Sequence, residues 1–368
     1  MSPHLSAEFL QLRKKFQELG FFRPATGAVV AQFTIHIIVC LSGLLLTIQA
    51  STLTVKLLGL LGSTVGMLGI ATNAHTSSHN ASTQNRAFNR ALLLIGYPFF
   101  MQLSSTYWHY KHVVVHHPVP NIVGVDDDID LAPWFALTDV EYRSASRLTK
   151  LWYDVQWFFF PIALFLNGFN VQVTGWKFLL GKLFSRDRRV SHWWDLAAML
   201  AHIGVWIVLP MFFFEPLHVL LLYTARIGLM GYAMFIAFAP AHFPEEAFAV
   251  AASNRSADFA LIQCANTINF RAGRLGRLLC SGVDYQIEHH LFPTVSHVHY
   301  PKMSPYIREF CAKLGYPYRT LSWWKAIWKS FAVMKHRKCV YPQVSDFVTA
   351  PAVAPNGEVE CAPSARTR

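Results

Sequence analysis

The sequence predicts an all-helical integral membrane protein with four transmembrane helices arranged as two hairpins. Three observations support this fold class. Apolar residues make up 53% of the 368 residues and charged residues only 14%, whereas ordinary soluble domains carry roughly 25% charged residues. Four apolar stretches have about the length of 20 residues that a helix needs to cross a bilayer. The links within each pair of stretches are short enough to be tight turns.

The four spans follow each other in pairs. Residues 27–48 contain no charged side chain, and residues 57–74 form a second, shorter, glycine-rich span. Residues 196–214 and 217–241 are separated by only two residues. Each pair is therefore predicted to form a helical hairpin.

Two further apolar runs are predicted to lie on the membrane surface. Residues 91–103 are too short to cross a bilayer, and residues 152–169 are interrupted by Asp154. Such runs are more typical of interfacial or buried helices. Around the spans, the chain divides into a cytosolic segment (1–26), one domain (27–350) and a disordered tail (351–368) that is rich in proline and alanine.

Basic residues orient the spans, because the cytoplasmic flanks of membrane helices collect lysine and arginine. The two short links hold one basic residue, Lys56, although the net charge of the chain is +11. Both termini and residues 75–193 are therefore expected on the cytoplasmic side, in a bacterial inner membrane rather than the endoplasmic reticulum. With so many apolar runs, the positive charge fits an anionic membrane surface, and no nucleic-acid partner is expected.

Three short boxes concentrate the histidines. They hold seven of the 17 histidines of the chain, namely His75, His79, His112, His116, His117, His289 and His290. Residues four apart share one face of a helix, so His75 and His79 are predicted to bind one metal ion or two neighbouring ones. His112 and His116 repeat this spacing, and His117 turns to an adjacent face where a second ion could bind. Neutral imidazoles suit iron, copper or zinc.

Further candidates lie beside the fourth span and the third box. His242 leaves the fourth span toward the side of the boxes, so it is a predicted ligand. Gln286 lies three residues before His289 and offers an amide at about one helical turn. His109 lies three residues before His112 and is interpreted as a packing or hydrogen-bonding residue rather than a ligand.

Acidic residues near the boxes are predicted to orient ligand histidines. Asp126 and Asp128 follow the second box and are interpreted as partners of the outer ring nitrogens, in preference to direct ligands. For Glu288, inside the third box, this role and surface exposure both stay open. Within the spans, His202 is interpreted as a hydrogen-bonded core residue, and Arg226 is expected to face the bundle and to pair with another group.

The ordered boxes resemble those of the membrane-bound fatty acid desaturases. H-x-x-x-H is followed by H-x-x-x-H-H and then by Q-x-x-H-H with Leu-Phe-Pro after it. The likeness runs from about His75 to Tyr318 and includes Gln263 and Tyr300 near the third box. Gln286 stands where many relatives have histidine, as is common in acyl-lipid and front-end members. Phe238 departs from relatives that place a polar residue there.

The resemblance implies both a fold and a reaction. Four transmembrane helices would be topped by a cytosolic helical cap that holds two non-haem irons. The reaction would be the O2-dependent removal of two hydrogens from adjacent methylenes of an acyl lipid or acyl thioester. The implied iron ligands are the seven box histidines and His242, with Gln286, Asp126 and Asp128 supporting the metals.

The electron donor is expected to be a separate ferredoxin or b-type cytochrome, because residues 1–26 are too few to hold a fused cytochrome domain. An acidic donor could dock on basic residues of the cap and tail, although a solvated or lipid-facing basic surface explains these residues as well. The residues are Lys325, Lys329, Lys335, Arg337 and Lys338.

An unactivated methylene has no acidic proton and no leaving group, so breaking its C–H bond requires an oxidising metal centre and a narrow tunnel that presents the target carbons. The aromatic residues that could line this tunnel, or anchor the chain at the interface, are Phe99, Phe100, Trp108, Trp157, Phe158 and Phe159.

The alternative functions of a hydroxylase, acetylenase or ketolase stay open, because the same centre could add oxygen. A metal transporter is disfavoured, since transit ligands should lie along the membrane path.

Overall fold

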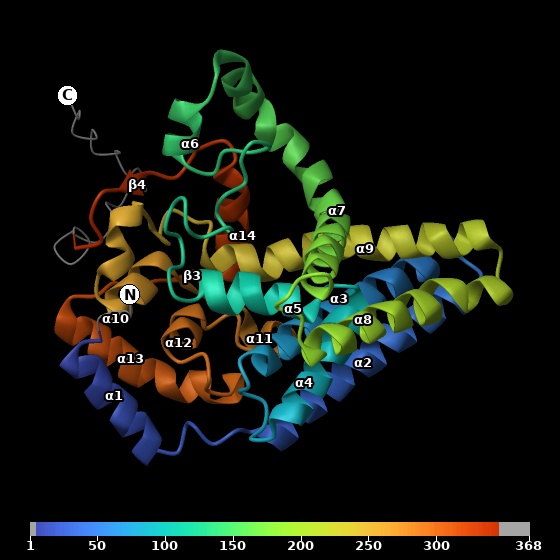
Figure 1. Cartoon of the computed structure of the whole chain (residues 1–368), viewed down its shortest axis with the longest axis horizontal. Coiled ribbons are helices and arrows are strands. Elements are labelled where there is room, and N and C mark those ends of the chain that lie inside the picture. The colour runs from blue at the N-terminus through green and yellow to red at the C-terminus, as the bar shows by residue number, and fades with distance from the viewer. Residues whose placement is uncertain (1–4, 346–368) are drawn as a thin grey trace.

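The computed structural model describes residues 5–345, with residues 255 and 256 described by their backbone alone. The described chain is mostly helical, which confirms the predicted class at that level. Figure 1 shows long helices that extend to one side of the molecule and short helices that gather on the other. The predicted disordered tail, residues 351–368, lies outside the described residues.

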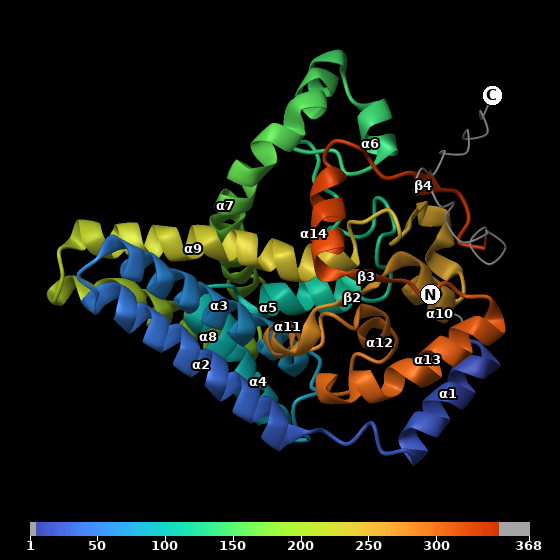
Figure 2. The ribbon, with the colours of Figure 1, turned by 180° about the vertical axis from the view of Figure 1, so that it is seen from behind.

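Two hairpins of long helices form one end of the molecule (Figures 1 and 2). The first joins α2 (Thr26–Gln49) to α3 (Leu53–Ser78). The second joins α8 (Val190–Ile203), which continues through the π-helical turn η3 (Gly204–Val208) and the 3-10 turn η4 (Pro210–Phe212), to α9 (Pro216–Phe238). Helices therefore occupy all four predicted spans. α3 extends beyond its predicted end and carries His75 within the helix.

The long helices pack closely where glycines face a neighbouring backbone. A side chain on Gly66 of α3 would collide with the backbone of Cys40 in α2. Gly231 of α9 faces the carbonyl of Leu164 in the same way. Close backbone approach through small residues is typical of helix contacts in membranes.

α7 (Arg147–Leu183) is longer than the surface helix predicted over residues 152–169. It continues through Pro161, and buried residues recur at helical spacing beyond residue 169, at Gln172, Leu179 and Leu183. In the described chain, α7 is one of five helices long and apolar enough to cross a membrane, where four were predicted. Figures 1 and 2 show α7 running across the direction of α2 and α9.

The second predicted surface run, residues 91–103, forms two short elements. α4 (Arg86–Leu94) leads into η1 (Ile95–Phe99), a π-helical turn that contains Pro98. Proline lacks the N–H of a regular helix, and wider turns occur where the regular ladder is disturbed. Gly96 lies against Ala74 of α3, so this segment packs beside the first histidine box.

The short helices α1 and α10–α14, here named the cap, cover one end of the hairpins. Their largest core joins Phe9 and Phe16 of α1 (Ala7–Glu18) to Phe292, Met303 and Ile307. The other helical elements outside the hairpins are α5 (Ser105–Trp108), η2 (His109–His116), α6 (Asp139–Ser144), η5 (Ala239–Ala241), η6 (Ala252–Ser256), α10 (Phe259–Asn266), α11 (Gly273–Cys280), α12 (Gln286–Leu291), η7 (His297–His299), α13 (Tyr300–Leu314) and α14 (Trp323–Ala332).

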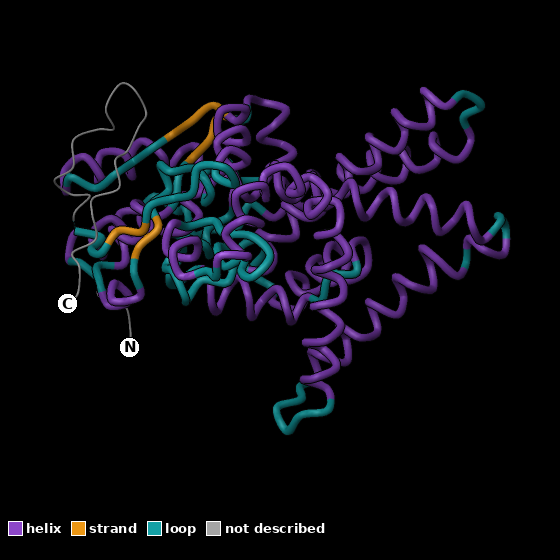
Figure 3. The backbone as a smooth tube through the Cα atoms, turned by 90° about the horizontal axis from the view of Figure 1, so that it is seen from above, coloured by secondary structure: helices purple, strands orange, loops and turns teal. Residues whose placement is uncertain are grey.

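Two short pairs of parallel strands connect the C-terminal segment to the rest of the chain. β1 (Ala249–Val250) pairs with β4 (Val340–Tyr341), so that Ala249 aligns with Val340. β2 (Asn269–Arg271) pairs with β3 (Thr320–Ser322), with Phe270 opposite Leu321. Figure 3 shows both pairs in orange, far from the turns of the hairpins.

Candidate metal centre

All eight predicted ligand histidines are buried where the hairpins meet the cap, and none is more than 6% exposed. They come from four segments, which are the end of α3 (His75, His79), η2 with the residue after it (His112, His116, His117), the residue after η5 (His242) and α12 (His289, His290). Residues far apart in the sequence are thus brought to one place.

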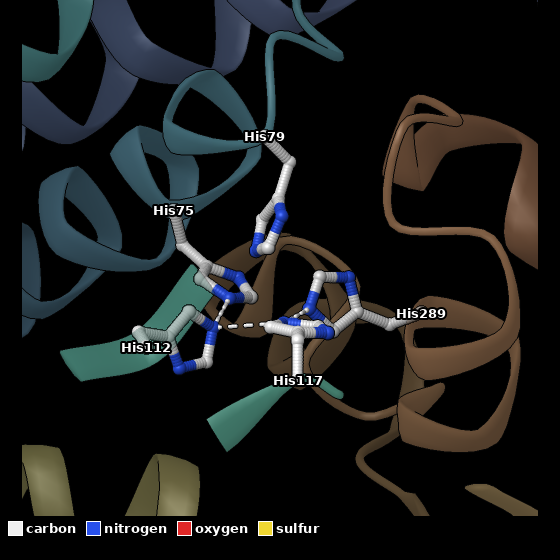
Figure 4. Close-up of side chains that lie close together, drawn as sticks. All are labelled: His75, His79, His112, His117 and His289. Atoms are coloured by element: carbon white, nitrogen blue, oxygen red, sulfur yellow. Dashed lines mark hydrogen bonds between the residues drawn. The ribbon is translucent and has the colours of Figure 1, made fainter. Parts of the chain in front are cut away.

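Five of these side chains converge in one group, here named the five-histidine cluster (Figure 4). One ring nitrogen from each of His75, His79, His112, His117 and His289 lies within 4.8 Å of the others. Nε2 of His112 lies 2.6 Å from Nε2 of His75 and 3.1 Å from Nε2 of His117. Nε2 of His117 lies 3.0 Å from Nε2 of His289. Two nitrogens bound at right angles to one ion, each at about 2.1 Å, would be roughly 3 Å apart, so the spacing suits a shared ion.

Burial keeps these imidazoles neutral. It lowers the pKa of His79, His112, His117 and His289 well below the ordinary value, and the neighbouring imidazoles lower it further. The neutral ring is the form that binds a metal. Nε2 of His79 has no hydrogen-bond partner among the described residues. Because a buried nitrogen without a partner is costly, the cluster fits a bound metal ion.

The other three histidines form the three-histidine cluster. His116, His242 and His290 also place ring nitrogens within 4.8 Å of one another, and in the described chain Nε2 of His290 has no partner. The amide nitrogen of Gln286 lies 3.3 Å from Nε2 of His242, and the buried amide oxygen is unpaired within the described residues. Gln286 therefore belongs to this cluster. The two clusters are adjacent, since the rings of His117 and His290 stack at 4.4 Å.

The second box is divided between the clusters differently from the prediction. Helical spacing predicted that His112 and His116 share one face and that His117 lies on an adjacent face where a second ion could bind. However, η2 is a π-helix, and the N–H of His117 donates to the carbonyl of His112 at 3.0 Å. In this wider turn the residues four and five positions after His112 both lie near its face, and ligand atoms of His112, His116 and Asp128 also lie within 4.8 Å of one another. His112 and His117 join the five-histidine cluster, and His116 joins the other.

The part of the chain that contains both clusters matches one known protein family. Residues 51–322, which contain all eight histidines, match the fatty acid desaturase family. The chain belongs to the fatty acid desaturase family. The family consists of oxidoreductases, and membership confirms the resemblance of the histidine boxes.

Individual desaturases resemble the chain at low identity. It is 27% identical to a Delta(5) fatty acid desaturase of Caenorhabditis elegans, in an alignment that covers 69% of this chain and 57% of that protein. It is 25% identical to a Delta(8)-fatty-acid desaturase of Arabidopsis thaliana, covering 88% and 72%. It is 26% identical to an sn-1 linoleoyl-lipid 6-desaturase of Synechocystis, covering 74% and 77%. The chain thus spans little more than half of the first relative and about three quarters of the other two.

In this member of the family, Asp126 and Asp128 both contact His116. Nδ1 of His116 donates to Asp126 at 2.9 Å and lies 3.3 Å from the carboxylate of Asp128. Asp126 also accepts the N–H of Asn121 at 2.8 Å, and Asp128 pairs with Lys111 at 2.7 Å. Burial lowers the pKa of His116, but the two carboxylates outweigh it and leave the pKa raised. Because Nδ1 is engaged, Nε2 of His116 is the nitrogen left for a metal.

Two other contacts with the histidines were not assigned from the sequence. Nδ1 of His290 donates to Oε1 of Gln263 at 3.0 Å, and Nδ1 of His289 lies 3.0 Å from the hydroxyl of Tyr300. Gln263 and Tyr300 belong to the desaturase likeness, but their separations of 27 and 11 residues from the histidines gave no signal of contact. Both contacts fix the orientation of a ring whose other nitrogen points into a cluster.

The loop of His242 is held through its backbone carbonyl. Nζ of Lys338 donates to this carbonyl at 2.6 Å and also to the carbonyl of Ala247. Nδ2 of Asn121 donates to the carbonyl of His242 at 2.9 Å. Lys338 is only 2% exposed, so its predicted place on a basic docking surface is wrong. The two backbone acceptors, rather than solvent, satisfy its ammonium group.

Glu288 fixes the helix of the third box, a role that was not among those predicted for it. Its carboxylate is buried and accepts hydrogen bonds from the hydroxyl of Tyr318 at 2.5 Å and from Nδ2 of Asn269 at 2.7 Å. Oδ1 of Asn269 in turn accepts the N–H of Ile287 at 2.9 Å. These contacts anchor α12, which carries His289 and His290.

Asp195 of α8 holds the start of the second box. Its buried carboxylate accepts hydrogen bonds from the hydroxyls of Ser104 (2.7 Å) and Thr106 (2.6 Å) and from the N–H groups of Ser105 (3.0 Å) and Thr106 (2.9 Å). These groups belong to the start of α5, where helical N–H groups lack partners within the helix. Asp195 therefore fixes where α5 and η2 begin, although the sequence places it about 90 residues away.

The remaining predicted residues lie outside the clusters. His109 is exposed and belongs to neither cluster, so it is not placed as a ligand. His202 is a hydrogen-bonded core residue, as predicted, because Nδ1 contacts the carbonyl of Phe99 at 2.7 Å and Nε2 lies 3.0 Å from the hydroxyl of Tyr223. The ring of Phe238 lies 5.8 Å from that of His75 and forms an apolar wall of the five-histidine cluster.

Proposed function

We propose that the protein is an oxygen-dependent di-iron desaturase that introduces a double bond into a fatty acyl chain. The observation that carries this proposal is the convergence of eight buried histidines from four segments into two adjacent clusters. Family membership supports the reaction class. The similarity to an sn-1 linoleoyl-lipid 6-desaturase supports an acyl lipid as the substrate.

Each cluster would hold one iron ion. The five-histidine cluster would supply His75, His79, His112, His117 and His289, and the three-histidine cluster would supply His116, His242 and His290, with Gln286 beside them. Iron suits the reaction better than zinc, which has no redox chemistry. Bound iron would use O2 and two electrons to remove two hydrogens from adjacent methylenes.

The protein's own side chains would orient the ligands and exclude water. Asp126 and Gln263 hold the rings of His116 and His290 by their outer nitrogens. Trp108 stacks on His112 at 4.6 Å and, together with Phe238, gives the five-histidine cluster an apolar wall. A dry site limits competing reactions with water.

A groove between α7 and α9 is the proposed entry for the acyl chain. Its volume is about 610 Å³, and its lining includes Trp152, Phe159, Phe160, Phe235 and Phe243. Phe243 directly follows His242, so the inner wall of the groove adjoins the three-histidine cluster. Of the aromatic residues predicted to line a tunnel, Phe159 lines this groove, and Trp108 lies against His112.

Four of the five apolar helices would cross the membrane, and α7 would lie along its surface. This topology is supported by the orientation of α7, which runs across the hairpins, and by the turns of the hairpins, which lie away from the cap (Figure 1). The domain would extend over residues 27–350, and both termini and the clusters would face the cytoplasm of a bacterial cell. Lys56 is the one basic residue of the two predicted short links.

A separate ferredoxin or b-type cytochrome would supply the electrons. Among the cations predicted to dock it, Lys329 pairs with Glu246 at 2.6 Å, and Arg337 pairs with Asp154 at 3.3 Å. The other two described candidates outside the core are Lys325 and Lys335, and both are exposed. These two residues are therefore the proposed contacts for an acidic donor.

Lipid profiling of a desaturase-free host that expresses the gene tests this function. We expect new unsaturated acyl chains, iron in the purified protein, and O2 consumption that requires a reductant. Hydroxylated, acetylenic or keto products would instead assign one of the related reactions. A purified protein that carries zinc or copper without iron, and that yields no new lipid, would contradict the proposal.

A further inference from the structure

Arg226 is a buried cation without an acidic partner in the described chain. It lies ten residues after Pro216, the first residue of α9, and is 5% exposed. Nη2 approaches two sulfur atoms, Sγ of Cys40 at 4.0 Å and Sδ of Met67 at 3.9 Å. Within the described residues, Nε has no hydrogen-bond partner, and no carboxylate forms an ion pair with the guanidinium. The guanidinium also lies over the ring of Trp206, 5.0 Å from its centroid, so within the described residues its partners are an aromatic ring and two sulfur atoms rather than an oxyanion.

Arg226 lines a cavity between the two hairpins, on the side of their turns. The cavity has a volume of about 980 Å³. Most of its wall is apolar and includes Leu44, Ile48, Leu209, Phe213, Val219 and Leu222. Figure 3 shows the turns of the two hairpins standing apart at this end. Lys56 and Glu215 lie near the turns and also line the cavity.

The position of the guanidinium favours an anion that arrives through this cavity. Side chains on a helix generally lean toward its N-terminus, and Arg226 lines the same cavity as Glu215 and Pro216 at the hairpin turn. A charge inside the apolar layer is costly and is usually paired. The planar guanidinium binds carboxylates and phosphates through two parallel hydrogen bonds. Glu215 is exposed at the turn, so it does not neutralise the buried guanidinium.

We propose that this cavity binds an amphiphile with an oxyanion head group, either the phosphate of an anionic phospholipid or the carboxylate of a fatty acid. Arg226 binds the oxyanion, and the apolar wall holds the chain. Lys56 adds a second positive charge near the turns. The site is separate from both histidine clusters, because none of their residues lines the cavity. It is therefore independent of the proposed chemistry.

Thermal unfolding of the purified full chain in neutral detergent tests this site. A ligand that binds only the folded state raises the unfolding midpoint. We expect phosphatidylglycerol or oleate to raise it more than phosphatidylcholine does. Arg226→Met keeps the length of the side chain and removes its charge. In this variant the extra rise of the unfolding midpoint with phosphatidylglycerol or oleate, here called the excess, should disappear. Arg226→Lys should keep most of it. The control Lys313→Met removes an exposed cation of α13 and should leave the excess unchanged.

Native mass spectrometry gives the affinity of the same lipids. Loss of a charged hydrogen bond should weaken the binding of the active lipid by about tenfold or more in Arg226→Met. Leu222→Trp, which fills the cavity without changing the charge, should weaken it too. Whichever amphiphile shows the dependence on Arg226, phospholipid or fatty acid, identifies the source of the oxyanion. Equal binding of anionic and zwitterionic lipids by the unmodified protein, or unchanged binding in both variants, would overturn the proposal. Iron content, measured on the same samples, separates this outcome from failure of the metal centre.

Discussion

The two histidine clusters lie side by side but are built differently. The five-histidine cluster gathers imidazoles from α3, η2 and α12 around one point. The three-histidine cluster has fewer imidazoles, and an amide, Gln286, lies beside them. Hydrogen bonds from other residues hold each of its histidines. Asp126 contacts His116, and Gln263 contacts His290. Lys338 contacts the backbone carbonyl of His242.

This difference indicates which substitutions should weaken metal binding in each cluster. A site with five imidazoles holds its ion through more protein ligands than a site with three, so a small change in the orientation of one ring affects it less. A site with three depends on the exact orientation of each ring, and partners of the outer nitrogen set that orientation. We therefore expect changes outside the ligands to affect the three-histidine cluster more strongly.

Loss of one ligand from either cluster should have the largest effect. His289→Ala changes the five-histidine cluster, and His116→Ala changes the three-histidine cluster. Each should reduce the product below detection in the expressing host, because the proposed reaction needs both irons, while membrane insertion stays normal. His109→Ala, in the same π-helix η2 as His116 but exposed and outside both clusters, is the matched control and should keep most activity. Turnover by either purified ligand variant would show that its cluster is not part of the catalytic centre.

Asp126→Asn should weaken iron binding in the three-histidine cluster by about 10- to 100-fold, as is typical for partners of ligand histidines. The variant keeps the size of the side chain but removes the charge that faces Nδ1 of His116. Asp128→Asn should have a smaller effect, because Asp128 is partly exposed and already pairs with Lys111. Chelator competition with iron-loaded protein measures both. Equal loss of iron from the two variants would show that the buried Asp126 is no more important for iron binding than the partly exposed Asp128.

Gln286→His should reduce the difference between the clusters by giving the poorer one a fourth imidazole. Iron binding in the three-histidine cluster should tighten by about tenfold, and Gln286→Ala should weaken it slightly. The number of irons retained per chain during dialysis against a chelator reports the change. An unchanged iron content in both variants would place Gln286 outside the coordination shell.

Tyr300→Phe should have a still smaller effect, because it removes one hydrogen-bond partner of His289 and leaves the ring in place. A net hydrogen bond contributes about 1 kcal/mol, which corresponds to roughly fivefold in iron affinity. The same titration measures it. A loss as large as that of Asp126→Asn would show that the five-histidine cluster depends on its partners as much as the smaller one does.

His202→Ala should have the smallest effect on turnover. His202 is hydrogen-bonded to Phe99 and Tyr223 and belongs to neither cluster. The variant should be less stable, because it leaves a buried carbonyl with one partner fewer, but it should keep substantial activity when folded. Complete loss of activity in a folded, iron-loaded variant would give this histidine a direct role.

Most of the correct predictions of helices and ligands rested on residue types and on long apolar runs. Helices occupy the four predicted spans because each run is long and carries no charged residue except Arg226 in the fourth. α7 was predicted too short, because Asp154 and the polar residues near Asn167 break the apolar pattern while the helix continues to Leu183. The placement of basic residues, and of His75, His79 and His242 at the ends of spans, predicted that the eight histidines face one side, and the structure brings them into two adjacent clusters.

The grouping of the ligands could not be predicted from helical spacing. Because η2 is a π-helix, His117 joins His112 in the five-histidine cluster and His116 joins the other cluster. The spacing of residues in a regular α-helix does not predict this grouping. The contacts of Asp195 with Thr106 and of Lys338 with His242 join residues that are 89 and 96 positions apart. Such contacts depend on how the hairpins and the cap pack together, so a single sequence does not predict them.

Anomalous X-ray scattering from crystals of the iron-loaded protein, recorded on both sides of the iron absorption edge, tests the central claim most directly. Two iron peaks are expected, one among His75, His79, His112, His117 and His289, and one among His116, His242 and His290. The peak in the second position should weaken in Asp126→Asn, while the first should keep its height. A single peak, or peaks away from these side chains, would contradict a dinuclear centre built from both clusters.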